Sequence, residues 1–484
     1  MLRRLTIERT TLLILLLLVF ALAARVPVDT DTWWHLRSGE TIVTDGFIRA
    51  DTFSHTLYGA PWVNHSWGAQ IILNTAWQIG GMTGLVIYMA GLTTAGMGVI
   101  YAMCAGNTYV RAFAIILGAA TAAVFWSPRP QMLSFFLSAV SLYLLFLYKY
   151  RATDRLWLYP PLMALWGNLH AGFAIGFIFL GALVVGETLN RLFNPSKAGT
   201  GWRGIGKMAL VGVVSVAALL INPVGLQILA VPFQTVGIGA LRNFIQEWNS
   251  PNFQGRETWP FIALLLGVFA ASGISRRRLD WTEFFLIGGT AFMGLLAGRN
   301  IAVFAVPATP ILTFFVDDFL RERGWVLQTI RRVKPRMVVV NVILLLVVLF
   351  ATVIKTISVV LPRIVDQAMT AALPVEAVAY LKREGAPGAL FNSYNWGGYL
   401  IYALRDEPVF VDGRTDLYGD TLLTRYLTTA IGGDGWRETL DEYAIGTVLI
   451  ETQSGLARRL RDEPGWTLDY SDDLAVVFTR TEGQ

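Results

Sequence analysis

The sequence predicts an α-helical polytopic membrane protein of about eleven transmembrane helices that ends in a small α/β domain. Three observations lead to this fold class. Hydrophobic residues make up 54% of the 484-residue chain and charged residues only 15%, whereas soluble domains are usually about one-quarter charged. The apolar residues gather in long runs, and arginine and lysine gather in every second connection between them. The runs stop near residue 364, where shorter strand-like and helical segments alternate.

The first apolar run covers roughly residues 8–25 and follows a basic head. Its length and its small-residue end also fit a cleaved signal peptide, so that alternative stays open. We interpret the run as an uncleaved first span, because ten more apolar runs follow it. These fall near residues 82–104, 112–127, 131–148, 156–168, 171–189, 208–222, 260–274, 283–298, 301–316 and 337–361.

Charge placement orients these spans. With the N-terminus in the cytoplasm, the inward connections carry most cations, including Arg3, Arg4, the run Arg276 to Arg278 and the series between 321 and 336. The outward connections hold far fewer, so this assignment obeys the positive-inside rule. An odd number of spans then places the C-terminal tail on the extracytoplasmic side.

Three apolar stretches have informative lengths. Residues 156–189 and 283–316 each make 34 residues, about 51 Å as one helix, whereas two spans need about 40 residues. Each stretch therefore predicts a hairpin that turns below the outer surface, and residues 112–148 also turn, at a Ser-Pro-Arg-Pro-Gln segment. Polar residues at such depth usually face protein or a wet cavity, although capping helices and binding lipid phosphates is the alternative role. The tips hold Arg129, Gln131, Asn168, His170, Arg299 and Asn300.

The first outer loop, about residues 26–81, is strongly patterned. Asp29 and Asp31 directly follow the first span, and Trp33 and Trp34 are expected to pin a short helix near 32–43 in the membrane interface. A divalent metal bound by Asp29, Asp31 and His35 is the less favoured alternative to a loop structured by its histidines, because the spacing matches no strong ligand motif. No cofactor is therefore certain. All four histidines fall on the predicted outer side: His35, His55, His65 and His170.

A second outer loop, about residues 223–259, carries Glu247 beside Trp248. An acid next to an indole ring can hold a sugar by hydrogen bonds and stacking, although the same pair also serves as an interfacial anchor. The chain lacks a P-loop, a GxSxG or HExxH motif and a basic stripe suited to nucleic acid, which argues against nucleotide-driven chemistry inside the cell and against nucleic-acid binding. Its one cysteine, Cys104, excludes an internal disulfide framework.

The tail predicts an extracytoplasmic α/β domain, residues 365–484, after a membrane domain of residues 1–364. Strand-like pieces alternate with helical stretches, which favours a mostly parallel sheet. Polar clusters that include Asp412 and Arg414 follow the first two pieces, where open α/β sheets often bind ligands. The alternative is that an Asp–Arg pair docks the domain on the membrane part. The four pieces are residues 388–393, 407–412, 445–450 and 474–479.

Several of these motifs together resemble a known group. The first loop reads DTDTWWHL, then DTFS and PWVNHSW; the hairpin tips read RPQ and NLH; the second outer loop reads EW; and the tail reads WGGY and DGR. This pattern is similar to bacterial membrane proteins related to the glycosyltransferase C superfamily, and it runs along most of the chain. The resemblance implies a protein of the bacterial inner membrane.

The resemblance also implies a reaction. The donor would be a sugar on a polyprenyl phosphate, and the acceptor a glycan, lipid or protein on the outer face. An acidic residue of the first outer loop acts on the acceptor in such enzymes, and the matching positions are Asp31 and Asp29. The acidic pair of protein mannosyltransferases is adjacent in sequence, whereas Thr30 separates these two residues, which leaves the base itself in question.

Physical chemistry assigns the other roles, because the phosphate leaving group gains charge and cations stabilise it. Arg129 and Arg299 are expected to bind the donor phosphate or lipid. Expected contacts of sugar or acceptor are His35, His65, Trp67, Asn168, His170, Glu247, Trp248, Asp412 and Arg414. Two alternatives to an enzyme remain: a non-catalytic scaffold or subunit of a larger protein complex, and a transporter, which would need broken helices near the bilayer midplane.

Overall fold

The computed structural model describes residues 6–237, 239, 246–325 and 335–481. The expected inward cations Arg3, Arg4, Arg331, Arg332 and Lys334 lie outside these residues. Two compact units make up the chain. The helical unit comprises residues 1–25, 86–228 and 245–359, and the α/β unit comprises residues 26–85, 229–244 and 360–484.

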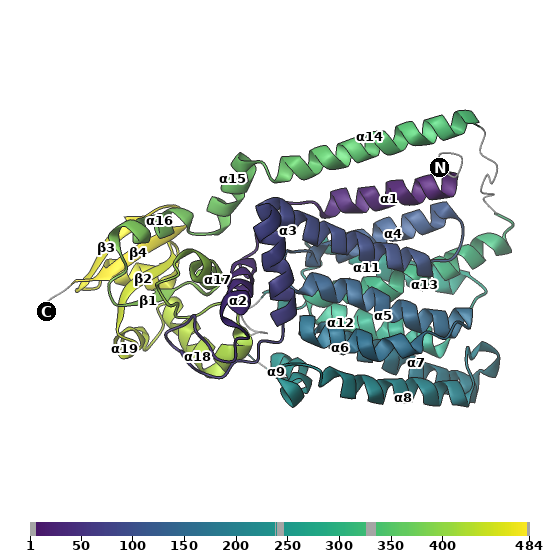
Figure 1. Cartoon of the computed structure of the whole chain (residues 1–484), viewed down its shortest axis with the longest axis horizontal. Coiled ribbons are helices and arrows are strands. Elements are labelled where there is room, and N and C mark those ends of the chain that lie inside the picture. Colours follow the sequence, from purple (N-terminus) through teal and green to yellow (C-terminus); the bar gives the residue numbers. More distant parts are fainter. Residues whose placement is uncertain (1–5, 238, 240–245, 326–334, 482–484) are drawn as a thin grey trace. The chain divides into compact units, whose positions relative to one another are not determined.

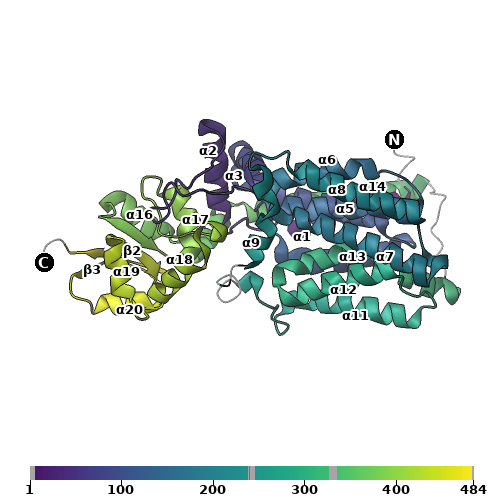
Figure 2. The same cartoon turned by 90° about the horizontal axis from the view of Figure 1, so that it is seen from below.

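Long apolar helices form the helical unit (Figures 1 and 2). In the described part of the chain, eight helices are long and apolar enough to cross a membrane, and α12 is apolar but shorter. Every predicted apolar run overlaps a helix, which confirms the polytopic helical fold, while the number of eleven spans stays a prediction. The helices are α1 (Ile7–Ala23), α3 (Trp67–Met103), α4 (Thr108–Ala122), α5 (Gln131–Arg151), α6 (Tyr159–Leu169), α7 (Ala174–Phe193), α8 (Trp202–Leu219), α11 (Trp259–Ile274), α12 (Trp281–Leu296), α13 (Ile301–Glu322) and α14 (Pro335–Val359).

The three predicted hairpins are present. Between α4 and α5 the chain forms the short turn η2 (Ala123–Phe125) and then a segment with Pro128 and Pro130, which cannot donate helical hydrogen bonds. η4 (Ala171–Phe173) separates α6 from α7, and η9 (Gly298–Asn300) separates α12 from α13. α6 has only 11 residues, fewer than the roughly 20 that a full span needs.

A buried ionic cluster joins α5, α7 and α12 at their ends away from the hairpin tips. Lys149, in the last turn of α5, binds Glu187 of α7, and its Nζ lies 2.9 Å from Asp280 Oδ2. Asp280 caps α12 and accepts a hydrogen bond from Glu283 N. Buried charges are costly unless they are paired and hydrogen-bonded. The cluster therefore fixes the ends of α5, α7 and α12 to one another at the end of α5 away from Arg129.

A four-stranded sheet forms the centre of the α/β unit, in the order β1-β2-β4-β3. β1 pairs parallel with β2, whereas the β2–β4 and β3–β4 pairs are antiparallel. The expected mostly parallel sheet is therefore wrong. The reason is a hairpin, since three residues join β3 to β4 and a short connection forces antiparallel pairing. The strands are β1 (Ala389–Asn392), β2 (Ile445–Glu451), β3 (Trp466–Ser471) and β4 (Ala475–Arg480).

The expected strand at 407–412 is an extended segment outside the sheet ladder. Phe410 N donates to Asn392 Oδ1 at 2.7 Å, and Asn392 Nδ2 donates to Val411 O at 2.8 Å. Val409 also forms a parallel bridge with Ser54 of the first outer loop. The Asn392 side chain thus takes the place of backbone ladder hydrogen bonds beside β1. Ser54 of the first outer loop pairs with the same extended segment.

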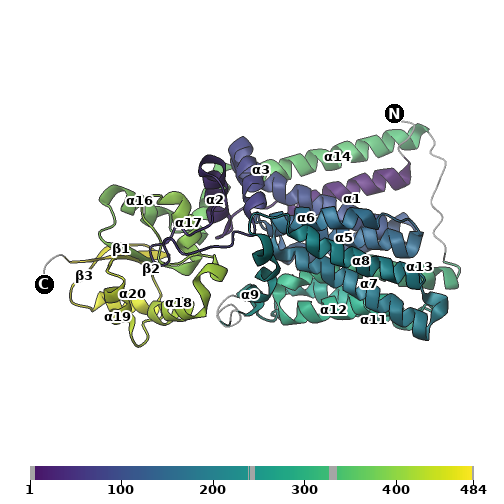
Figure 3. The ribbon, with the colours of Figure 1, turned by 60° about the horizontal axis from the view of Figure 1, so that its bottom comes forward.

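Helices cover both faces of the sheet (Figure 3). One face packs against α18, α19 and α20 around a core that includes Phe391, Phe410 and Phe478. The other face contacts α16. The helices of this unit beyond α3 are α2 (Thr32–Asp45), α9 (Val231–Gly237), α15 (Pro362–Ala372), α16 (Val375–Glu384), α17 (Tyr394–Ala403), α18 (Thr415–Ala430), α19 (Trp436–Glu442) and α20 (Gly455–Arg461).

The predicted short helix of the first outer loop is α2, and it packs against α17. Trp33 and Trp34 are buried, so the expectation that both rings lie in the membrane interface is wrong. Trp33 makes edge contacts with Trp77 and Tyr399, with ring centroids 5.8 and 5.5 Å apart. Large aromatic rings gain most from full burial where protein surface is available.

Candidate functional site

Two cationic tips of the helical unit meet at one carboxylate. Arg129 lies in the α4–α5 connection, and Arg299 lies in η9 between α12 and α13. Arg129 Nη2 is 2.9 Å from Glu247 Oε2, and Arg299 Nη1 is 3.5 Å from Glu247 Oε1. Glu247 belongs to η7 (Gln246–Trp248). The first and third hairpin tips and the second outer loop therefore come together.

Further contacts hold this group in place. The Arg299 guanidinium lies 4.3 Å from the centroid of the Trp248 ring, a cation–π contact. Arg129 Nε donates to Ser127 Oγ at 3.0 Å, and Gly298 N donates to Asn249 O at 3.0 Å. Burial raises the pKa of Glu247, but Arg129 and Arg299 more than offset this and leave that pKa below its ordinary value. The glutamate is therefore ionised at neutral pH.

The second hairpin tip joins the first through a histidine. Trp166 Nε1 donates to Ser134 Oγ at 2.8 Å, and Ser134 Oγ is 2.8 Å from His170 Nδ1. Gly172 N also donates to His170 Nδ1, so Nδ1 is an acceptor and the neutral ring carries its proton on Nε2. Ser134 lies in the first turn of α5, beside Arg129. All three predicted tips thus belong to one end of the helical unit.

Sequence reasoning missed Arg25, a third cation of this group. Its Nη2 donates to Ala123 O at 2.5 Å, and its guanidinium lies 5.5 Å from the centroid of the Trp126 ring. Both partners belong to the α4–α5 tip that carries Arg129. The signal was available, because Arg25 directly ends the first apolar run of the sequence.

The acidic pair lies in the α/β unit and is locally ordered. Asp31 N donates to Asp29 Oδ1 at 2.9 Å, and Trp34 Nε1 donates to Asp31 Oδ1 at 3.3 Å. Asp31 stands directly before α2, where the partial positive charge of a helix N-terminus attracts anionic groups.

Two glycines of the tail motifs touch this acidic segment. A Cβ on Gly413 would lie 1.9 Å from Asp31 Oδ1, and a Cβ on Gly398 would lie 2.6 Å from Thr30 O. Glycine is therefore required at both positions for the tail backbone to approach the acids. These contacts give a structural reason for the WGGY and DGR motifs.

Asp412 and Arg414 form a fully buried cluster with the first outer loop. Arg414 Nη1 is 2.5 Å from Asp51 Oδ1, and Arg414 Nη2 is 2.7 Å from Asp412 Oδ2. The Tyr418 hydroxyl donates to Asp412 at 2.5 Å, and Ser54 Oγ donates to Asp51 at 2.5 Å. Contact between a sugar and Asp412 or Arg414 would require both side chains to become exposed.

The remaining expected residues lie in separate settings. His35 is buried, and its Nδ1 is 3.4 Å from Gln70 Nε2. His65 Nδ1 is 3.9 Å from Asp416 Oδ2. The Trp67 ring centroid is 6.1 Å from that of Phe47, and Asn168 Nδ2 donates to the carbonyls of Ala164 and Ile221. In the described part of the chain, no three His, Cys, Asp or Glu side chains form a cluster suited to a metal ion.

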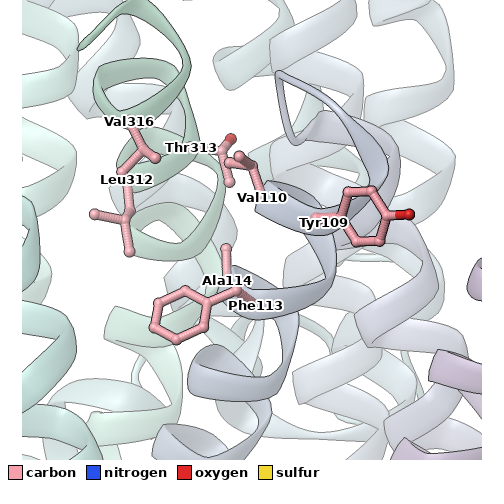
Figure 4. Close-up of a pocket in the computed structure, with 7 residues that line it drawn as sticks. All are labelled: Tyr109, Val110, Phe113, Ala114, Leu312, Thr313 and Val316. Atoms are coloured by element: carbon pink, nitrogen blue, oxygen red, sulfur yellow. The ribbon is translucent and has the colours of Figure 1, made fainter. Parts of the chain in front are cut away.

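An apolar groove of about 230 Å³ lies between α4 and α13 (Figure 4). It is lined by Tyr109, Val110, Phe113, Ala114, Leu312, Thr313 and Val316. Its four α4 residues are at the start of that helix, whereas Arg129 follows the end of the same helix. The groove has no charged lining residue, so it is not suited to a sugar phosphate.

Apolar spanning helices with cationic hairpin tips, together with a small α/β unit, define a multi-pass membrane protein. The sequence matches no family model and no curated protein. Solved structures share its architecture. The archaeal oligosaccharyltransferase AglB from Archaeoglobus fulgidus, in complex with an inhibitory peptide and a dolichol-phosphate, has a TM-score of 0.58 and 12% identity, over 98% of this chain and 74% of its own.

Two further solved structures have a similar fold. The Archaeoglobus fulgidus oligosaccharyltransferase tethered with an acceptor peptide has a TM-score of 0.55 and 12% identity, over 98% of this chain and 74% of its own. ArnT from Cupriavidus metallidurans in the apo state has a TM-score of 0.53 and 14% identity, over 96% of each chain. At these identities the likeness establishes the fold. The chain has a glycosyltransferase-C-like fold, as its motifs implied.

Proposed function

We propose that this chain is a membrane glycosyltransferase that moves a sugar from a polyprenyl-phosphate donor to an acceptor at the outer face of a bacterial inner membrane. The observation that carries the proposal is the meeting of Arg129 and Arg299 at one anionic group on the hairpin tips. Paired arginines of this kind suit an anion such as a lipid phosphate. The structure of AglB in complex with an inhibitory peptide and a dolichol-phosphate adds support from a protein of similar fold.

The arginines would act on the leaving group. As the bond between the sugar carbon and the phosphate oxygen breaks, the phosphate keeps the bonding electrons and gains charge. Cations that are already in place stabilise this charge without reorganisation. Arg129, held by Ser127, and Arg299, held by Trp248, meet that condition.

Asp31 would act on the acceptor. Its carboxylate takes the hydroxyl proton as the acceptor oxygen bonds to the sugar carbon, which is general-base catalysis. Asp29 orients this segment by accepting the hydrogen bond of Asp31 N. Glu247, Trp248 and His170 are the proposed neighbours of the donor sugar in the helical unit. The other proposed contacts of sugar or acceptor are His35, His65, Trp67, Asn168, Asp412 and Arg414.

Sugar transfer in membranes tests this assignment. Asp31→Asn keeps the shape of the side chain but removes the base, so we expect transfer to fall about a hundredfold, with a smaller loss for Asp29→Asn. Asp45→Asn is the matched control, because Asp45 is an exposed carboxylate at the other end of α2. Wild-type turnover in both single variants and in their double variant would contradict the assignment.

One observation favours the alternative, a non-catalytic scaffold or subunit of a larger complex. Glu247 already neutralises part of the arginine charge, and a permanent pairing would leave the tips a structural role only. A stoichiometric partner that co-purifies with the chain, together with no lipid-phosphate binding, would favour the scaffold over the enzyme.

A further inference from the structure

We propose that Glu247 is an exchangeable counter-ion, whose carboxylate leaves Arg129 and Arg299 when a lipid phosphate binds to them. The inference rests on the proposed function, since it adds an exchange step to the same phosphate site. Its starting point is geometric: Glu247 offers Oε2 to Arg129 and Oε1 to Arg299. One group with two anionic oxygens therefore bridges the two guanidinium groups, and two oxygens of a phosphate can make the same bridge.

The two arginines have supports that do not depend on the Glu247 carboxylate. Arg129 Nε donates to Ser127 Oγ, and the Arg299 guanidinium stacks on Trp248 at 4.3 Å. The backbone beside Glu247 is fixed separately, because Gly298 N donates to Asn249 O at 3.0 Å. Rotation of the Glu247 side chain alone would therefore vacate the bridge and leave both cations in position.

Exposure makes the exchange accessible. The Glu247 side chain is 34% exposed, against 16% for Arg129 and 22% for Arg299. The Glu247 side chain is thus the most exposed of the three, and ion pairs that reach solvent contribute little to stability. A phosphate carries more negative charge and more acceptor oxygens than a carboxylate, so it competes well for the same donors. Before the lipid arrives, Glu247 reduces the repulsion between the two cations and keeps them preorganised.

The test measures binding rather than transfer, with the purified full-length chain in lipid nanodiscs. Undecaprenyl phosphate is the probe, and undecaprenol and inorganic phosphate are separate arms that report the tail and the free anion. Glu247→Gln removes the charge at constant shape, and we expect about tenfold tighter binding of undecaprenyl phosphate because the internal competitor is lost. Glu257→Gln is the matched control, because Glu257 is an exposed acid of the same loop. Glu247→Asp, which keeps the charge on a shorter side chain, should give an intermediate gain.

The possible results distinguish failure of the Glu247 exchange from failure of the phosphate site itself. A gain for Glu247→Gln with no change for Glu257→Gln and none in the undecaprenol arm supports the exchange. Unchanged or weaker binding by Glu247→Gln, with weaker binding by Arg129→Gln and Arg299→Gln, overturns the exchange and leaves the phosphate site intact. Binding that neither arginine variant weakens overturns both. A gain confined to inorganic phosphate overturns the lipid as the exchanging group.

Discussion

Gly413 lies so close to Asp31 that a side chain at position 413 would collide with the carboxylate. The site of its absent Cβ lies 1.9 Å from Asp31 Oδ1 and 3.3 Å from Trp34 Nε1. Any side chain at position 413 must push either the carboxylate or the tail backbone away. Since misplacing a catalytic group by about 1 Å can cost about a hundredfold in rate, this glycine controls the position of the proposed base.

Gly413→Ala should therefore lower sugar transfer at least tenfold at saturating donor, within the roughly hundredfold range for a displaced group. Gly80→Ala is the matched control, because Gly80 lies in a helix and a Cβ there meets no atom within 4 Å. That change should leave transfer unaffected. Initial rates and thermal unfolding of both variants check the prediction. Unaltered transfer by a folded Gly413→Ala variant would show that Asp31 is not positioned by this contact.

For single residues, the sequence predicted the positions of candidate site residues better than it predicted the residues that they contact. Arg129, His170 and Arg299 were placed at hairpin tips because helix length per residue is fixed, so a count of residues shows where a chain must turn. The pairing of Arg129 with Glu247 spans 118 positions, and no local pattern encodes such a contact. The burial of Asp412 and Arg414 with Asp51 is likewise a long-range property, so their motif alone left ligand binding and docking as alternatives.

At the scale of elements, the first outer loop is part of the α/β unit. Arg414 joins it through Asp51, with both side chains fully buried. Arg405 joins it through Glu40 at 3.0 Å, in a pair that is 44% and 28% exposed. The two ion pairs connect the same parts of the chain but differ in burial, so they should differ in energy.

Asp51→Asn should lower the free energy of unfolding of the α/β unit by about 3 kcal/mol, because it leaves Arg414 buried with one charged partner fewer. Glu40→Gln should cost about 0.5 kcal/mol, since water screens that pair. Chemical unfolding followed by tryptophan fluorescence compares them, as Trp33, Trp34 and Trp62 are buried in this unit. Equal costs for the two substitutions would argue against a structural role of the buried cluster.

The sheet shows why element-scale prediction was only partly right. β1, β2 and β4 were expected because their apolar residues are continuous and buried. β3 was missed because it is an edge strand whose side chains are mostly exposed, which removes the alternation that identifies a strand. Without β3, the antiparallel hairpin of β3 and β4 could not be predicted. The remaining alternation of helices and strands then favoured parallel pairing.

At the scale of the whole molecule, charged groups gather at both ends of the spanning helices. Lys149, Glu187 and Asp280 lie at the end of α5 that is away from Arg129, and exposed cations such as Arg276 and Arg278 lie in the connection before Asp280. Hydropathy and charge counts can predict which ends of the spans share a side, because a bilayer constrains every span at once. The sidedness itself stays a prediction.

Cysteine labelling tests the sidedness directly. The native Cys104 is buried, so single cysteines can be added at exposed positions over a low background. With the N-terminus in the cytoplasm, Asp473→Cys, in the turn between β3 and β4, should react with a membrane-impermeant maleimide in intact spheroplasts. Arg276→Cys, between α11 and α12, should react only after the membrane is permeabilised, because inward connections carry the cations. The reverse pattern would invert the topology and move the α/β unit, with Asp29 and Asp31, to the cytoplasmic side, where an outer-face transferase could not use them.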